Sequence, residues 1–427
     1  MIRIALVAGL AAALLVGGFE MFLVLGAAGL GAKLAFFPNI VDTALVQKMV
    51  GAVNHSTLLA IPFFIFAAEL MGDGQIARRL TAAMRAFLGH LPGGMGYTAI
   101  GGAMAFGSVS GSAPATVAAL GNLVYPEMRK EGFSEKFSLG LIASAAETAL
   151  LIPPSITIII YAWMTGTSVV DLFMAGLAIG IVLGLAFAIY TWWEARRGGI
   201  AGAERMGWPA RLRALREAVW ALGMPVIIMG GIYSGYLTPT DAAAVSVVYA
   251  ILVEMLVYRS MGLSRLMAVT QRAAVSTAII FILLAVGGIL AYIITLARLP
   301  DMLLMLLNDI GANWVLFLMM MNVVFLIAGM FIDPNSALII LVPTLFPVAM
   351  SLGIDPVHFG MIVTLNITIG MITPPFGLDL FVASSTLRKP VLTIIQGVWP
   401  FVGVNIVVLL LVSYIPGLST FLPALLK

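Results

Sequence analysis

Apolar residues fill this chain in long, nearly continuous runs separated by short polar stretches. A helix that crosses a bilayer needs about 20 predominantly apolar residues, and many of the runs approach or exceed that length. Because the runs are continuous rather than alternating between apolar and polar residues, they differ from the strands of a membrane β-barrel. The pattern predicts an all-α polytopic membrane protein with nine full crossings, near residues 4–30, 43–71, 137–160, 172–193, 218–236, 241–258, 272–297, 357–386 and 391–415.

Two of these crossings are interrupted by a pair of prolines. The pairs, Pro153-Pro154 and Pro374-Pro375, stand 221 residues apart. Proline removes a backbone N–H and clashes with the preceding turn, so each helix must break there. A break at membrane depth is tolerated only where the backbone packs against protein or lines a water-filled cavity. Interrupted helices at matching places in two halves therefore point to the binding site of a transporter.

Two further apolar stretches, 91–128 and 312–349, carry turn-forming residues at their centres. These are Ser110–Ser112 in the first stretch and Asp333–Ser336 in the second. We expect each stretch to form a re-entrant hairpin whose tip stops inside the membrane. If either stretch were a full crossing, later clusters of basic residues would fall on the wrong side of the bilayer.

The spacing of these features predicts an internal repeat. A shift of 222 residues carries Gly111, at the first tip, onto Asp333 at the second. From the start of the first broken helix to the start of the second, the chain makes five predicted crossings, the first broken helix included. Because five is odd, the two halves run through the bilayer in opposite directions. The sequence thus predicts an inverted-repeat transporter fold with two re-entrant hairpins and two broken helices.

Composition and charge agree with a single membrane domain. The chain is 62% hydrophobic and only 10% charged, which excludes a large soluble domain. With Arg3 inside, 18 of the 22 basic residues fall on the cytoplasmic side, as the positive-inside rule requires. The net charge of +3 therefore reflects basic loops rather than a nucleic-acid surface. We expect an N-terminal scaffold helix in 1–42, a first repeat in 43–193, a cytoplasmic linker with scaffold helices in 194–271, a second repeat in 272–415 and a tail in 416–427.

Oxygen-bearing residues gather at both tips and both breaks. Hydroxyl, amide and carbonyl oxygens are hard ligands that suit a sodium ion, although small residues here also let helices pack closely. The expected sodium ligands are Ser110, Gly111, Ser112, Pro153 and Pro154 in the first half, and Asp333, Asn335, Ser336, Thr368, Pro374 and Pro375 in the second. Between the tips we expect an organic carboxylate, held by Ser108, Ser112, Thr116, Asn366, Thr373 and Gly377.

Several acidic residues fall within or beside the predicted crossings. Glu147 and Asp379 lie close to the two breaks, and acids at membrane depth are functional candidates because burying a charge is costly. Glu147 fits an ion ligand, a proton site or the partner of a buried donor. Glu69 and Asp241 stand near predicted helix ends, where an interfacial carboxylate is the simpler interpretation.

No motif for catalysis or ATP hydrolysis fits this pattern. Gly107–Gly111 places two serines between two glycines, but its third residue is Val109, and the G-x-S-x-G nucleophile elbow of hydrolases also needs a preceding strand. A membrane enzyme would have to use one of three histidines, His55, His90 and His358. No Walker A loop is present, so a pre-existing ion gradient is the simplest source of energy. We expect a transporter rather than an enzyme, and an intramembrane Ser/His enzyme is the less favoured alternative.

Three motifs around the tips and breaks resemble the large membrane subunit of TRAP (tripartite ATP-independent periplasmic) transporters. They are SVSGSAPATVAALG, LIPPSITIIIYAWMTG and ITPPFGLDLFVASS, and LAIPFFIFAAELM at 59–71 is also similar to that family. The resemblance implies a sodium-driven importer of an organic acid that works by an elevator motion in the bacterial inner membrane.

The same resemblance implies two partner proteins. A periplasmic binding protein would deliver the substrate, and a small four-helix membrane subunit would brace the scaffold. We expect that subunit to be a separate chain, because no extra helices precede the large-subunit pattern. A stand-alone secondary anion transporter without a binding protein is the alternative. Glu147 and Thr148 depart from the small residues expected at these positions, which leaves open an altered substrate or coupling.

Overall fold

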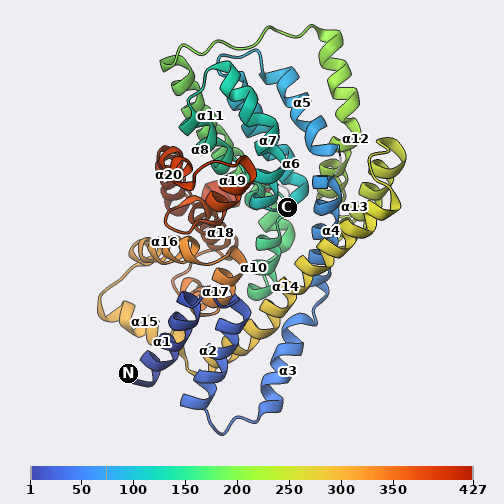
Figure 1. Ribbon diagram of the computed structural model, residues 1–427. Coiled ribbons are helices and arrows are strands. Elements are labelled where there is room, and N and C mark those ends of the chain that lie inside the picture. Colours follow the sequence, from blue (N-terminus) through green and yellow to red (C-terminus); the bar gives the residue numbers. More distant parts are fainter. Residues whose placement is uncertain (1, 74, 426–427) are drawn as a thin grey trace.

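The computed structural model describes residues 2–73 and 75–425, and every regular element within them is a helix (Figure 1). Eight of these helices are long and apolar enough to cross a bilayer, and one bent pair adds a ninth. This count includes both arms of the second predicted hairpin, so apolar length alone does not separate a crossing from a hairpin arm. The structure is therefore that of an all-α polytopic membrane protein.

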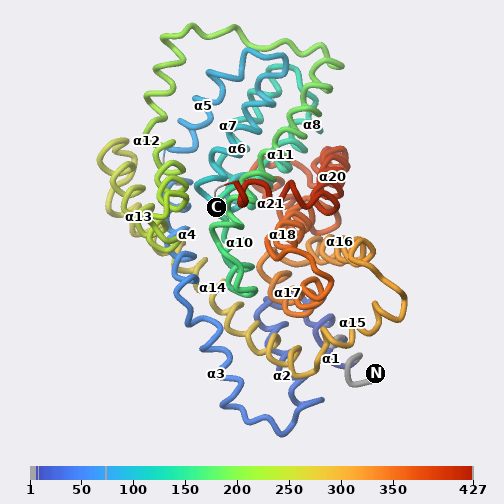
Figure 2. Tube along the Cα trace, turned by 180° about the vertical axis from the view of Figure 1, so that it is seen from behind, coloured from blue at the N-terminus to red at the C-terminus, as the bar shows by residue number. Residues whose placement is uncertain are grey.

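The N-terminal segment is a helical hairpin. α1 (Ile2–Val16) and α2 (Met21–Phe36) pack side by side, joined by a turn in which Gly18 has a φ of +74°. Glycine reaches this left-handed conformation readily, so the chain reverses there. The single crossing predicted over 4–30 is wrong. Because α1 starts at the same end of the molecule at which α2 finishes (Figures 1 and 2), the cytoplasmic placement of Arg3 fails with it.

The next predicted crossing, 43–71, is bent in the middle. α3 (Asp42–Val53) and α4 (Ala60–Asp73) meet at an angle of 56° across a short 3₁₀ turn, Ser56–Leu59. The amphipathic helix α5 (Ile76–Leu88) follows and buries its apolar face against the first hairpin and α12 (Trp208–Tyr233).

Both predicted hairpins and both predicted breaks are present. The first hairpin consists of α6 (Gly94–Ser110) and α7 (Ala113–Glu131), and the second of α16 (Trp314–Phe331) and α17 (Pro334–Ser351). Each hairpin is followed by a broken helix. The first comprises α8 (Glu135–Ala145), the short α9 (Thr148–Leu151) and α10 (Ile156–Thr165); the second comprises α18 (Pro356–Ile372) and α19 (Leu378–Leu387).

The two broken helices run in opposite directions. The backbone N–H of Ala203, in the linker, donates to Gly89 beside the first hairpin, so that hairpin starts at the linker end of the molecule. At the far end of α10, the Tyr161 hydroxyl donates to the carbonyl of Pro356 at 2.8 Å. The second broken helix thus begins where the first one finishes. This arrangement confirms the inverted repeat that the odd number of crossings between the starts of the two broken helices predicts.

The remaining helices surround these elements. They are α11 (Val169–Arg197), α13 (Pro239–Leu252, continued by a π-turn at Val253–Val257), α14 (Leu263–Leu296), α15 (Leu299–Asp309), α20 (Val391–Tyr414) and α21 (Gly417–Leu425). α14 crosses the molecule diagonally, and α21 packs against α11 (Figures 1 and 2). Asp241 forms a capping box with Thr238 at the start of α13, which accounts for that acid structurally.

Candidate functional site

The first tip is a compact cluster of hydroxyl groups. α6 ends at Gly111, whose φ is +58°, and Ser112 caps the start of α7 by accepting a hydrogen bond from the N–H of Ala115. The hydroxyls of Ser110 and Thr116 lie 3.1 Å apart, and Thr116 donates to the carbonyl of Ser112 at 2.8 Å. The hydroxyl oxygens of Ser110 and Thr116 and the carbonyl oxygen of Ser112 therefore lie close together at the tip.

This tip lies directly against the first break. A Cβ built on Gly111 would come within 2.4 Å of the carbonyl oxygen of Pro154, so only glycine fits the approach. Beyond the break, Ser155 is fully buried and caps α10 by accepting from the N–H of Ile158. The hairpin turn and the broken helix thus form one structural unit.

The second tip is built around an aspartate. Asp333 caps α17 and accepts hydrogen bonds from the N–H groups of Asn335 and Ser336, both at 3.1 Å. The Ser336 hydroxyl also donates to the Asp333 carboxylate. The side-chain oxygen of Asn335 is buried and accepts no hydrogen bond from the described residues. An acceptor of this kind is available to a cation.

At the second break the polar side chains mostly bond to their own helix. Thr368 donates to Thr364, and Thr373 donates to Ile369 at 2.6 Å. Asn366 donates to Asn322 of α16 at 2.7 Å, while its own side-chain oxygen finds no donor among the described residues. The helix resumes at α19 after Gly377, which lies against the carbonyl of Met371.

A single cavity of about 630 Å³ joins the two halves of this site. Both tips reach it, as do both broken helices and the helices α4 and α14. Its polar lining residues are Glu69, Ser110, Ser112, Thr157, Arg272, Ser276, Asp333 and Asn335, and Gly111 lies among them. Because hairpins that start at opposite ends meet in this cavity, their tips stop in the interior of the molecule.

Several of the predicted site residues lie outside this lining. Ser108 donates to the carbonyl of Ala105 within α6. The others are Thr116, Ser336, Asn366, Thr368, Thr373 and Gly377, together with the four prolines of the breaks. They belong to the same hairpins and broken helices, but they do not line the cavity. Their predicted roles in binding sodium or substrate stay predictions.

The sequence interpretation missed one charged pair in the cavity. Arg272 of α14 contacts Glu69 of α4, with Nε and Oε2 3.3 Å apart. Both residues line the cavity opposite the tips, and about half of the Arg272 side chain is exposed. Glu69 is thus more than an interfacial carboxylate. The sequence shows Arg272 as a basic residue at the start of an apolar run. It does not show that Arg272 pairs with Glu69, because Glu69 lies 203 positions away.

The histidines do not form a catalytic pair with the serines of the first tip. Ser110 bonds to Thr116 and to the backbone at Ser112. His55 caps a 3₁₀ turn, His90 lies 3.3 Å from Arg211, and His358 contacts Ser419 at 3.1 Å. The arrangement of the described residues therefore offers no general base to this serine.

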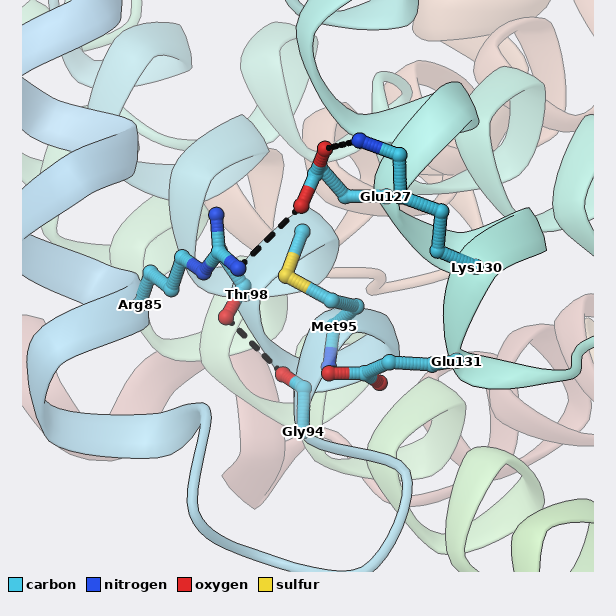
Figure 3. Close-up of polar contacts among 7 residues, drawn as sticks. All are labelled: Arg85, Gly94, Met95, Thr98, Glu127, Lys130 and Glu131. Atoms are coloured by element: carbon cyan, nitrogen blue, oxygen red, sulfur yellow. Dashed lines mark hydrogen bonds and ion pairs between the residues drawn. The ribbon is translucent and has the colours of Figure 1, made fainter. Parts of the chain in front are cut away.

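Salt bridges hold the base of the first hairpin to α5 (Figure 3). Arg85 of α5 contacts Glu127 of α7 at 3.1 Å, and Glu127 also binds Lys130 at 2.6 Å. The Glu131 carboxylate accepts from the N–H of Met95 at 3.0 Å, which ties the two arms of the hairpin together. On the other side of α5, Arg79 contacts Glu217 of α12. α5 therefore connects the hairpin to the surrounding helices.

Two buried acids lie behind the cavity. Glu147, between α8 and α9, and Asp379, in the first turn of α19, are both fully buried. Asn405 of α20 donates to Glu147 at 2.9 Å. The remaining oxygen of Glu147 and both oxygens of Asp379 accept nothing from the described residues.

Comparison with known proteins identifies this architecture. Residues 8–418 match the family described as tripartite ATP-independent periplasmic transporter, DctM component. The ectoine/5-hydroxyectoine TRAP transporter large permease protein of Ruegeria pomeroyi is 38% identical over 412 residues, 96% of each chain. The C4-dicarboxylate TRAP transporter large permease protein of Pseudomonas aeruginosa is 39% identical over 399 residues, 93% of each chain.

A solved structure supports the fold. The YdaH transporter of Alcanivorax borkumensis aligns with a TM-score of 0.59 at 14% identity, over 90% of this chain and 87% of that one.

The relatives from Ruegeria pomeroyi and Pseudomonas aeruginosa are both transport permeases, which confirms the expectation of a transporter rather than an enzyme. The chain belongs to the tripartite ATP-independent periplasmic transporter family, as its DctM component, the large permease subunit.

Proposed function

We propose that this permease couples the inward flow of sodium to the uptake of an organic acid across the bacterial inner membrane. The observation that carries the proposal is the single cavity shared by both tips and both breaks. Such a convergence supplies oxygen ligands, freed backbone groups and two helix N-termini at one place. No Walker A motif is present in the sequence to supply ATP-driven transport.

Two sodium ions would bind where the tips meet the breaks. The first would use Ser110, Gly111 and Ser112 with the backbone around Pro153 and Pro154. The close approach of Gly111 to the Pro154 carbonyl supports this position. The second would use Asp333, Asn335 and Ser336 with Thr368, Pro374 and Pro375. The Asp333 charge and the vacant acceptor on Asn335 support that position.

The substrate would occupy the cavity between the tips and α14. Its carboxylate would be attracted by the positive ends of the helix dipoles at the starts of α7 and α17, and by the charge of Arg272. Relatives named for ectoine and for C4-dicarboxylates support a small organic acid as the substrate class.

Two partners and one motion complete the proposal. A periplasmic binding protein delivers the substrate, and a separate four-helix membrane subunit braces α12–α14. The hairpins and broken helices move together as an elevator against that scaffold. The close contact between Gly111 and the Pro154 carbonyl supports the movement of the first hairpin and the first broken helix as one body.

Reconstituted uptake tests this function. The permease and its two partners are placed in proteoliposomes, and uptake of a labelled C4-dicarboxylate and of ectoine is measured under an inward sodium gradient. We expect uptake of one of these acids with sodium and none with an equal potassium gradient. Uptake that persists without sodium would refute the coupling. Uptake that persists without the binding protein would instead favour a stand-alone anion transporter.

A further inference from the structure

The first broken helix holds a carboxyl group with no counter-charge. Glu147 is fully buried, and its one hydrogen bond from the described residues comes from the Asn405 amide at 2.9 Å. Asn405 is also fully buried, and its side-chain oxygen accepts no hydrogen bond from the part of the chain that the structure describes. An ionised carboxylate in such surroundings would lose its hydration without compensation, so it is expected to be neutral.

One proton would satisfy both groups. The Asn405 amide donates to Oε2 of Glu147, which leaves Oε1 of Glu147 and Oδ1 of Asn405 as two acceptors without a donor. A protonated carboxyl group is a donor as well as an acceptor. A proton on Oε1 would let Glu147 donate to Asn405 Oδ1 while it accepts from Nδ2, so that acid and amide pair through two hydrogen bonds.

A second acid strengthens this argument. Asp379 lies in α19, which packs against α8; it is fully buried and receives no hydrogen bond from the described residues. Two like charges in a medium of low polarity disfavour each other. The surroundings are apolar, and include Ala146, Leu150 and Leu380 of one buried cluster.

The other helices around this site bring no compensating charge close to it. α6 faces the break with Gly107, which lies against Ala149, while its Tyr97 stands near the opposite end of the helix. The charged residues of α7 and α11 occupy helix ends, and Glu135 at the start of α8 pairs with Lys389. Tyr161 of α10 and His358 of α18 are hydrogen-bonded to other groups. α20 contributes Asn405 and no charged side chain.

We propose that Glu147 is a proton-binding site, in which the bound proton is donated to Asn405. The site joins the two repeats, because Glu147 belongs to the first broken helix while Asp379 and Asn405 belong to the second half. α8 and α20 are in backbone contact nearby, where Gly140 lies against the carbonyl of Gly397. Loss of the proton would place an uncompensated negative charge between these packed helices.

Infrared spectroscopy of the purified full-length protein tests the proposal directly. We expect the wild type at neutral pH to show the deuterium-sensitive C=O stretch of a protonated carboxylic acid, and Glu147→Gln to lose the part of this band that Glu147 contributes. Glu217→Gln is the control, because Glu217 is more than half exposed and paired with Arg79, and it should keep the band. Glutamine can donate to and accept from Asn405 as the protonated acid does, so this variant should fold, which size-exclusion chromatography checks.

Other results of the same measurement would contradict the proposal. A wild type without the band, or a Glu147→Gln variant that retains it in full, would overturn the proposal. Loss of the band only in Asp379→Asn would move the proton to Asp379 and contradict the assignment to Glu147. A band that appears only when sodium is removed would identify a cation site instead. None of these readings depends on transport, so they remain valid if the proposed function fails.

Transport gives a second measurement that rests on the proposed function. If the bound proton is needed, wild-type uptake should fall about tenfold per pH unit once the pH is high enough to remove the proton. The infrared band should disappear over the same range. Glu147→Gln cannot lose this proton, so its uptake should not show that fall. An identical alkaline fall in Glu147→Gln would show that the proton acts elsewhere.

Discussion

Gly111 at the first tip and Pro154 at the first break are in backbone contact, so that a Cβ at position 111 would come within 2.4 Å of the Pro154 carbonyl oxygen. The contact joins two elements that are separated in the sequence by the whole of α7, α8 and α9. It fixes the position of the tip relative to the freed backbone of the break. The proposed first sodium site depends on this distance.

Gly111→Ala should therefore impair transport. The variant must push the tip away from Pro154, and a left-handed alanine costs about 1 kcal/mol in addition. We expect sodium-driven uptake to fall at least about tenfold, which corresponds to ~1.4 kcal/mol. Gly166→Ala is the matched control, since Gly166 also has a positive φ, +69°, but has open space around its Cβ position. Equal loss in both variants, with equal membrane insertion, would show that backbone strain rather than the contact is responsible.

Asp333→Asn should weaken the response to sodium. Asparagine keeps the helix cap that Asp333 provides to Asn335 and Ser336 but removes the charge from the cavity. We expect the sodium concentration for half-maximal uptake to rise about tenfold, a change of ~1.4 kcal/mol. Uptake measured over a series of sodium concentrations gives this value.

Asp355→Asn controls for the loss of a capping aspartate. Asp355 accepts hydrogen bonds from Val357 and His358 at 2.8 and 3.0 Å at the start of α18, yet it does not line the cavity. The two variants should lose similar stability, but only Asp333→Asn should change the sodium dependence. An unchanged sodium dependence in Asp333→Asn would remove Asp333 from the proposed second site.

The prolines and hairpin turns could be predicted from sequence because they act locally. Each proline pair, Pro153-Pro154 and Pro374-Pro375, removes two consecutive backbone N–H donors and stands where a helix ends, whereas the single Pro400 lies inside the continuous α20. The turn residues at Gly111 and Asp333 also act locally. The turn at Gly18 gave a similar local signal. It was overlooked because the apolar run around it is long enough for one crossing.

Pairings between distant residues could not be predicted in this way. Arg272 contacts Glu69, and Asn405 contacts Glu147, which lies 258 positions away in the sequence. A neutral asparagine within an apolar helix gives no indication of which buried group it will contact. Only the crossing of the packed helices decides such partners, so the contacts of the cavity wall and of the buried acids had to come from the structure.

Arg272→Gln should weaken the binding of an anionic substrate. Arg272 supplies the positive charge on the cavity wall opposite the tips, and its replacement also leaves Glu69 to repel a carboxylate. We expect the substrate concentration for half-maximal uptake to rise about tenfold or more, with little change in the sodium dependence. Arg298→Gln is the control, because Arg298 pairs with Asp301 at 3.5 Å and does not line the cavity. If Arg272→Gln binds substrate normally, the carboxylate lies elsewhere.

The elevator motion predicts correlated changes in accessibility at the two tips. Ser112 and Asn335 line the cavity from opposite hairpins, and the chain has no native cysteine to confuse the labelling. Single cysteines at both positions should change their rate of reaction with a membrane-impermeant thiol reagent when sodium and substrate are varied. A cysteine at Ser234, exposed at the end of α12, should react at a constant rate. Ligands shift such an equilibrium only by their preference for one state, so the size of the change measures that preference. Tips that respond in opposite senses, or only one of which responds, would show that the hairpins do not move as one body.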